Sequence, residues 1–202
     1  MSDSALAEIL SDVVRRGEAV GIVAGVATEG REPTFHAVGS PAIAGGEALH
    51  SDSRFAIGSL TKQFTAACVL LLRERGQLSF EDRLDDYVAD LVHLQSISLG
   101  QLLHHTSGLP KIGVRTGADP YTASPLRTRI AGIDPRQCIA PGVKYRYSNW
   151  NYWLLGRVVE VVSGRSYADF LHEEIFRPLG MTDSSCDPRR RTVLGHTGEP
   201  GA

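Results

Sequence analysis

The segment Phe55-Ala-Ile-Gly-Ser-Leu-Thr-Lys-Gln-Phe64 predicts the end of a strand, a tight turn at glycine and then a helix. Ser59 stands at the start of that helix and Lys62 one turn further on. Residues three apart share a helical face, so the Lys62 nitrogen can approach the Ser59 oxygen. A helix start also offers unpaired N–H groups and a partial positive charge, which favour a developing anion. The segment therefore supplies a candidate nucleophile, a candidate base and one oxyanion donor, the Ser59 N–H.

A simpler interpretation of the Ser-x-x-Lys spacing stays open. The chain has 17 serines and 3 lysines, so chance alone predicts roughly 0.25 such pairs, and the bare motif is weakly informative. Ser59 can be a helix N-cap and Lys62 a solvated side chain. A second motif is needed to choose between the two interpretations.

The composition is typical of a globular protein, with 42% hydrophobic and 22% charged residues in a chain of 202, enough for one good core or two small ones. A net charge of −2 gives no reason to expect a nucleic-acid partner. The first eight residues have neither a basic nor an apolar segment, so no signal peptide is expected, and no apolar run predicts a membrane span. Cysteines that are odd in number and widely spaced predict reduced thiols and a cytoplasmic location.

Hydrophobic spacing predicts a helix over residues 4–16 and a hairpin of two strands over 21–27 and 34–38. The helix of Ser59 is expected to run to about Arg75. Its apolar stripe is predicted to consist of Leu60, Phe64, Ala67, Cys68 and Leu71.

A mainly helical region is expected next, with short helices over residues 98–105 and 166–176. A longer helix between them is predicted, with Trp153, Leu154, Val158, Val161 and Val162 as its apolar residues and Gly164 as its end. His104 and His105 are adjacent and point to different helical faces, so no metal site and no cofactor are predicted.

Three parts of the chain follow from this pattern. Residues 1–80 are expected to form the N-terminal part of an α/β domain with the nucleophile helix, and residues 81–186 a helical domain. Residues 187–202 have little apolar content and are predicted to be a polar tail.

The second motif is Tyr147-Ser-Asn149. With 6 tyrosines and 2 asparagines in the chain, chance predicts roughly 0.06 Tyr-x-Asn matches. Side chains two apart on an extended segment face the same way, so Tyr145, Tyr147 and Asn149 are expected on one side. A tyrosine whose pKa is lowered by a lysine ammonium can take the serine proton, and an asparagine can orient the lysine and hold a substrate amide. The alternative is a core tyrosine and a helix-cap asparagine.

Together these motifs resemble the serine β-lactamase-related, penicillin-recognising family, which includes class C β-lactamases, DD-carboxypeptidases and related esterases. The resemblance covers about residues 18–186. The matching phrases are Phe55–Thr65, Gly76-Gln-Leu-Ser-Phe-Glu-Asp82, Leu102-Leu-His-His-Thr-Ser-Gly-Leu-Pro110, Pro141-Gly142 with Tyr147-Ser-Asn149, and Leu154-Leu-Gly156 through Pro178-Leu-Gly-Met181.

The resemblance implies an α/β (α+β) fold of the β-lactamase/transpeptidase type, with an inserted helical domain and the site in the cleft. It also implies an acyl-serine hydrolase that acts on a small ester, amide or β-lactam without a cofactor. Ser59 would be the nucleophile, Lys62 and Tyr147 would activate it, and Asn149 would touch the substrate.

The chain departs from the family at its third motif, Lys or His, then Thr or Ser, then Gly, on a late strand that also supplies the second oxyanion donor. His196-Thr-Gly198 spells it but lacks a flanking strand pattern, and we interpret the match as coincidence. The rival interpretation is that residues 192–200 fold back as a strand beside Ser59. If the match is a coincidence, the chain lacks the late sheet strands and exposes a sheet edge that invites self-association. The alternative function is then that of a truncated, non-catalytic fragment of the family.

Overall fold

The computed structural model describes residues 3–42, 48–88, 97–111, 133–190 and 193. The chain divides into two compact units, one made of Met1–Gly58 with Asp183–Ala202 and the other of Ser59–Thr182. The helix of Ser59 thus belongs with the helical residues that follow it. The three-part division at residues 80 and 186 stays a prediction about how the chain folds.

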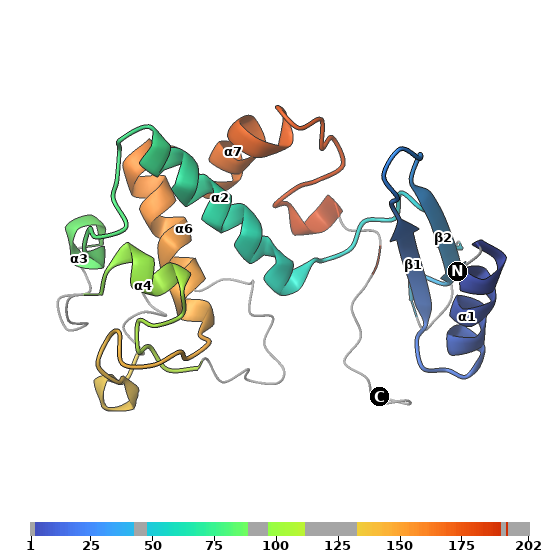
Figure 1. The fold of residues 1–202 in the computed structure, drawn as a ribbon, viewed down its shortest axis with the longest axis horizontal. Coiled ribbons are helices and arrows are strands. Elements are labelled where there is room, and N and C mark those ends of the chain that lie inside the picture. Colours follow the sequence, from blue (N-terminus) through green and yellow to red (C-terminus); the bar gives the residue numbers. More distant parts are fainter. Residues whose placement is uncertain (1–2, 43–47, 89–96, 112–132, 191–192, 194–202) are drawn as a thin grey trace. The chain divides into compact units, whose positions relative to one another are not determined.

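The first unit contains the hairpin that the sequence predicts. Helix α1 spans Asp3–Arg15, and strands β1 (Gly21–Val26) and β2 (Thr34–Gly39) pair antiparallel (Figure 1). Helix α1 packs against β2. The described part of the chain contains this one two-stranded sheet, so each strand has an edge that no other described strand covers.

The second unit consists of helices and turns. Its elements are η1 (Gly58–Leu60, whose first residue lies in the first unit), α2 (Thr61–Glu74), α3 (Leu84–Tyr87), α4 (Leu99–Leu103), η3 (Pro135–Gln137), α6 (Asn149–Ser163), α7 (Tyr167–Leu171) and η4, a π-helical turn (His172–Phe176). A short η5 (Pro188–Arg190) follows in the first unit. Helices α2 and α6 lie side by side, with α4 and α7 packed on α6 (Figure 1).

Most buried apolar side chains belong to this second unit. Val69 and Leu72 of α2, Leu102 of α4, and Leu154 and Val158 of α6 are almost completely buried against one another. By contrast, no residue of β1 or β2 is buried. The core that holds the start of α2 in place is therefore helical.

The predicted apolar stripe of α2 is wrong in part. Leu60 is 63% exposed, and the buried residues of α2 are Thr65, Cys68, Val69 and Leu72. The reason is that Leu60 lies in the 3₁₀ turn before α2, which does not continue the α-helical spacing.

In α6, Val161 is 41% exposed. The helix begins at Asn149, and the buried face includes Trp150, Leu155 and Val159 beside the predicted Leu154 and Val158.

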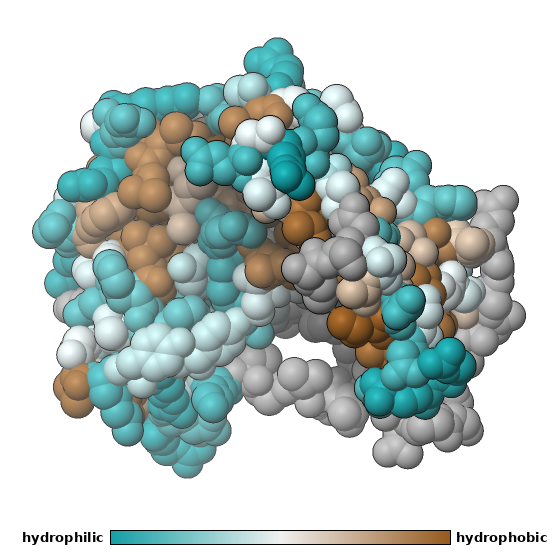
Figure 2. Space-filling view, turned by 45° about the vertical axis from the view of Figure 1, so that its right-hand side comes forward, coloured by the Kyte–Doolittle hydropathy of each residue, from teal (hydrophilic) through white to brown (hydrophobic). Residues whose placement is uncertain are grey.

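Hydrophobic side chains also reach the surface, where they appear as brown patches among polar residues (Figure 2). Leu70, Val161 and Leu179 are exposed in the second unit, as are Ile9 and Phe35 in the first. None of the described helices is long and apolar enough to cross a membrane.

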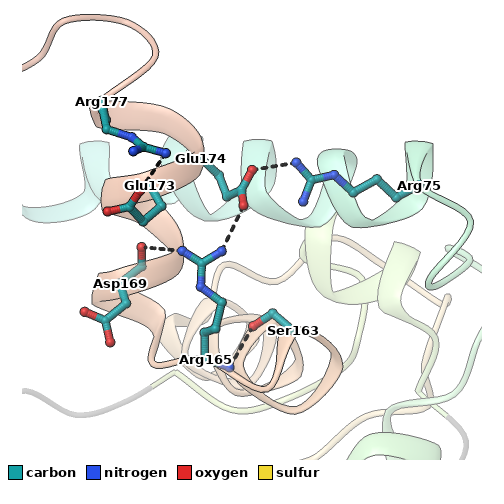
Figure 3. Close-up of polar contacts among 7 residues, drawn as sticks. All are labelled: Arg75, Ser163, Arg165, Asp169, Glu173, Glu174 and Arg177. Atoms are coloured by element: carbon teal, nitrogen blue, oxygen red, sulfur yellow. Dashed lines mark hydrogen bonds and ion pairs between the residues drawn. The ribbon is translucent and has the colours of Figure 1, made fainter.

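An ion-pair network joins the far end of α2 to the end of the second unit. Glu174 of η4 accepts from Arg75 at 2.5 Å and from Arg165 at 2.9 Å (Figure 3). Arg165 also donates to the carbonyl oxygen of Asp169. Hydrogen bonding to Arg75 holds the pKa of Glu174 below its usual value, with help from Arg165 and against the opposing effect of burial.

Candidate active site

The start of α2 positions Ser59 and Lys62. Gly58 has φ +51°, a left-handed conformation that a residue with a Cβ rarely adopts. Gly58 is the first residue of η1, which also carries Ser59, and α2 then begins at Thr61. Lys62 lies one turn beyond Ser59, and its Nζ donates to Ser59 Oγ at 3.0 Å.

The start of α6 supplies the second half of the cluster. Ser148 is its N-cap, in an extended conformation, and Asn149 is the first helical residue. The expected extended segment from Tyr145 through Asn149 is therefore wrong at its end. The two side chains still meet α2, because Tyr147 precedes the cap and Asn149 follows it. The Tyr145 and Tyr147 rings both lie against the His105 ring, as their spacing predicts.

The four residues predicted as a site lie together in one hydrogen-bonded cluster, which we call the serine cluster: Ser59, Lys62, Tyr147 and Asn149. The Tyr147 hydroxyl is 2.8 Å from Ser59 Oγ, and Lys62 Nζ donates to Asn149 Oδ1 at 2.8 Å. Lys62 makes no ion pair with any residue that the structure describes. Its ammonium also lies 4.9 Å from the centre of the Tyr147 ring.

The cluster changes the acidity of its tyrosine. Burial raises the pKa of Tyr147, but hydrogen bonding to Lys62 and Ser59 and the Lys62 charge outweigh it, so the pKa lies below the usual value of 10.0. A lowered pKa increases the fraction of phenolate at neutral pH, and phenolate is the form that can accept a proton.

His105 is part of this region, although sequence reasoning considered it only for metal binding. Its side chain is 8% exposed, its ring centre lies 4.5 Å from that of Tyr147, and its φ is +56°. Its Nδ1 is 2.9 Å from Asn151 Nδ2 and 3.3 Å from the backbone nitrogen of Ser148. The signal available in the sequence was its place in the phrase 102–110, which resembles the family.

The turn that carries His105 is tied to the segment before Tyr147. The backbone nitrogen of Ile139 donates to Gly108 oxygen, that of Gly142 to Thr106 oxygen, and that of Arg146 to His105 oxygen. Gly108 has φ +79°, and a Cβ there would lie 1.9 Å from Ile139 oxygen. Only glycine allows this close approach.

A cavity of about 560 Å³ borders Tyr147. It is lined by Lys111, Ile139, Lys144, Tyr145, Arg146 and Tyr147. Three of these side chains are cationic, and no carboxylate is among them.

Other predicted features contribute less to the site. His104 is exposed, and its Nδ1 contacts Gly100 oxygen. Among the described residues, no group of three side chains could hold a metal ion. The His196-Thr-Gly198 phrase lies outside the described residues.

Comparisons with known proteins identify the family of the chain. The family model described as Beta-lactamase matches residues 6–201. Penicillin-binding protein 4 of Amycolatopsis lactamdurans is 34% identical over 166 residues, which cover 77% of this chain and 43% of that protein. A penicillin-binding protein of Bacillus subtilis (strain 168) is 32% identical over 179 residues, covering 82% and 38%.

Alignment with solved structures identifies proteins of the same fold. D-amino acid amidase from Ochrobactrum anthropi SV3, complexed with L-phenylalanine amide, aligns with a TM-score of 0.82 at 26% identity, over 96% of this chain and 55% of that one. The octameric penicillin-binding protein homologue from Pyrococcus abyssi aligns with a TM-score of 0.78 at 27% identity, over 90% and 44%.

The fold is that of the serine β-lactamases and transpeptidases. The chain belongs to the β-lactamase family, within a superfamily of serine hydrolases. It spans about two-fifths of the length of the curated relatives named above. The resemblance stated from the sequence is thus confirmed for the family and for the fold.

Proposed function

We propose that the chain carries the nucleophilic half of an acyl-serine hydrolase, in which Ser59 is acylated by a small amide, ester or β-lactam. The observation that carries this proposal is that Ser59 Oγ lies within hydrogen-bond distance of both Lys62 and Tyr147. Tyr147 comes from a segment 88 residues away in sequence. A nucleophile and two candidate bases brought together across the fold are the arrangement that nucleophilic catalysis requires.

The hydrogen-bond directions favour Tyr147 as the first proton acceptor. A lysine ammonium can only donate, so Ser59 Oγ accepts from Lys62 and its own hydrogen is left for the Tyr147 oxygen. When Ser59 Oγ bonds to the substrate carbonyl carbon, its proton passes to the phenolate form of Tyr147. The bond to the leaving group then breaks, and the departing alcohol or amine takes that proton. The oxygen of a water molecule later bonds to the acyl carbon, the ester bond to Ser59 Oγ breaks, and a water proton passes to Ser59 Oγ, which releases the acid and restores the serine hydroxyl.

Labelling tests the assignment of Ser59. The chain is treated with a fluorophosphonate, and the modified residue is mapped by mass spectrometry. We expect the adduct on Ser59, no labelling of Ser59→Ala, and unchanged labelling of Ser11→Ala, because Ser11 lies on the exposed face of α1. Labelling at another serine, or equal labelling of Ser59→Ala, contradicts the proposal.

The substrate class is proposed from the cavity beside Tyr147. Lys111, Lys144 and Arg146 give it a positive potential, so substrates with a negatively charged group should bind better than neutral ones. The comparison to make is between hydrolysis of a nitrophenyl acetate and of a nitrophenyl hemisuccinate. Lys144→Met should remove roughly a two- to five-fold preference for the hemisuccinate, the size expected of an exposed charge. The matched control, Arg157→Met, lies on α6 away from the cavity and should leave the preference intact.

The second candidate is a family chain that is acylated slowly and turns over poorly. Among the described residues we assign one oxyanion donor, the Ser59 N–H. An oxyanion hole that lacks one of its donors typically loses about 10²–10³ in rate, so slow turnover is expected. Turnover of an ester, a D-amino acid amide and a chromogenic β-lactam separates the candidates. We expect Ser59 labelling with slow turnover. Brisk turnover that disappears in a version ending at Asp187 would show that residues 188–202 complete the site.

A further inference from the structure

A chain of hydrogen bonds lies behind the serine cluster, with a backbone N–H donor at each end: Leu109 at Ser107 Oγ and Ser148 at His105 Nδ1. A backbone N–H can only donate, so Leu109 N–H donates to Ser107 Oγ at 3.2 Å. The Ser107 hydroxyl then donates to Asn151 Oδ1 at 2.6 Å. This fixes the orientation of the Asn151 amide, whose Nδ2 faces His105 Nδ1 at 2.9 Å.

The direction of the chain determines the tautomer of His105. Both groups that face Nδ1 are N–H donors, namely the Asn151 amide and the Ser148 backbone nitrogen. Nδ1 therefore carries a lone pair and the proton of the neutral ring lies on Nε2. Ser107, Ser148 and Asn151 are all buried. With a proton on Nδ1, the buried N–H groups of His105 and Ser148 would face one another without an acceptor.

The ring held in this way forms the wall against which Tyr147 packs. Its centre is 4.5 Å from the Tyr147 ring, at an interplanar angle of 32°, and 5.3 Å from that of Tyr152. The His105 carbonyl oxygen also accepts from Arg146 N–H at 2.7 Å. One residue thus contacts the backbone on both sides of Tyr147, at positions 146 and 148, as well as its ring.

Backbone strain gives independent support. Among the described residues other than glycine, His105 alone has a positive φ. Such a conformation is strained for a residue with a Cβ and persists where its surroundings hold it in place. Asparagine adopts this conformation readily, so the backbone alone does not require histidine at position 105.

We propose that His105 is a positioning residue for Tyr147: its neutral ring, oriented by the chain from Leu109 through Ser107 and Asn151, holds the tyrosine hydroxyl at Ser59. The expected effect on the acylation rate rests on the proposed function. The tautomer of His105 and the position of Tyr147 do not depend on it. The groups that face the His105 ring are the Lys62 ammonium and the phenols of Tyr145, Tyr147 and Tyr152. Burial, together with the Lys62 charge, lowers the pKa of His105, which agrees with a ring kept neutral.

The first experiment reads the tautomer without any activity. In the full chain, the ¹⁵N shifts of His105 should show an unprotonated Nδ1 and a protonated Nε2. Asn151→Asp keeps the shape of the side chain but replaces the donor at Nδ1 with an acceptor, so Nδ1 should become protonated. An Nδ1 that is protonated in the unmodified chain, or unchanged shifts in Asn151→Asp, would overturn the proposed direction.

The second experiment separates positioning from folding. In His105→Asn, the new Oδ1 can replace Nδ1 as acceptor and the residue tolerates the positive φ, so the variant should fold, but the wall against Tyr147 is lost. A displacement of about 1 Å in a reacting group can cost on the order of 10²-fold, so we expect Ser59 acylation to fall about 10- to 100-fold. The measured Tyr147 pKa should rise, since its contacts with Ser59 and Lys62 loosen.

The neighbouring histidine provides a matched control, because His104→Asn changes the same residue type at an exposed position and should alter neither quantity. A folded His105→Asn with the unmodified acylation rate and Tyr147 pKa would refute the positioning role. If Ser59 is never labelled in the unmodified chain, the proposed function fails. The ¹⁵N shifts and the Tyr147 titration then still decide this inference.

Discussion

Helix α2 has a polar cluster near each of its ends, and the two clusters differ in whether a carboxylate neutralises their cations. Near its start, the Lys62 ammonium is surrounded by a hydroxyl, a phenol and an amide, all of them formally neutral. Near its far end, two guanidinium groups share the Glu174 carboxylate (Figure 3). Both clusters join α2 to segments far away in sequence.

The difference indicates what each cluster is for. A carboxylate beside a cation neutralises its field, which makes a pair suited to joining helices but poor at perturbing its neighbours. The charge of a lysine with neutral partners is not neutralised, so it shifts the pKa of a nearby titratable group. Here that group is Tyr147, whose pKa is lowered. The serine cluster is therefore expected to govern reactivity, and the Glu174 network stability.

The largest expected effect comes from removing either candidate base. Lys62→Met and Tyr147→Phe should each reduce Ser59 acylation by about 10² or more, because loss of a general base is costly. In Lys62→Met, the Tyr147 pKa should also rise, and the ascending limb of the pH–rate profile should move to higher pH. Stopped-flow acylation over a range of pH measures both quantities. Arg157→Met, which removes a cation on α6 outside the cavity lining, is the control, and a Tyr147→Phe variant of unchanged rate would refute the shared-base mechanism.

Asn149→Asp would make the first cluster resemble the second. A carboxylate in place of the Asn149 amide would pair with Lys62, stabilise its ammonium and oppose its effect on the neighbouring phenol. We expect acylation to fall by about 10-fold, together with a rise in the Tyr147 pKa. Asn149→Ser, which retains an oxygen acceptor without charge, serves as the comparison. Equal rates for the two variants would show that charge at this position does not matter.

Glu174→Gln makes the converse change in the second cluster. It leaves Arg75 and Arg165 without their shared carboxylate, and because both are partly exposed we expect a loss of about 1 kcal/mol in the free energy of unfolding. Urea unfolding measures this, and a double-mutant cycle with Arg75→Gln isolates the pairwise contribution. Ser59 acylation should be unchanged, and a ten-fold loss of it would mean that the two ends of α2 are coupled.

The smallest expected effect is the pH dependence that Glu174 gives to stability. Its pKa in the folded chain lies below the usual 4.5, so its contribution is complete above about pH 4.5 and is lost as the pH falls through the lower folded value. Glu174→Gln should therefore differ most from the unmodified chain near neutral pH and least in strong acid. A difference that instead grows on acidification has the wrong sign for a paired carboxylate.

The sequence was sufficient to predict the fold family, the hairpin and the four members of the serine cluster, because these depend on local spacing and on short motifs. The buried faces of α2 and α6 were predicted only in part. A 3₁₀ turn at Leu60 and a helix start at Asn149 changed which side chains point inward, and neither boundary has a strong local signal.

His105 could not be assigned from the sequence for a different reason. Its environment is created by Ser148 and Asn151, which are more than 40 residues away, and by a left-handed backbone conformation that few non-glycine residues adopt. The adjacent His104 has the same side chain in an exposed position. Only tertiary packing distinguishes the two.

The backbone bonds between the His105 turn and the segment before Tyr147 make the assembly of this region observable by hydrogen exchange. The Arg146 and Ser148 amides donate to His105 itself, so they can exchange with deuterated solvent only when the turn and the segment separate. Their exchange rates should therefore rise and fall together, and they should exchange more slowly than the amide of the exposed Val143. Mass-resolved exchange would thus report how often the region opens in a chain that has met no substrate.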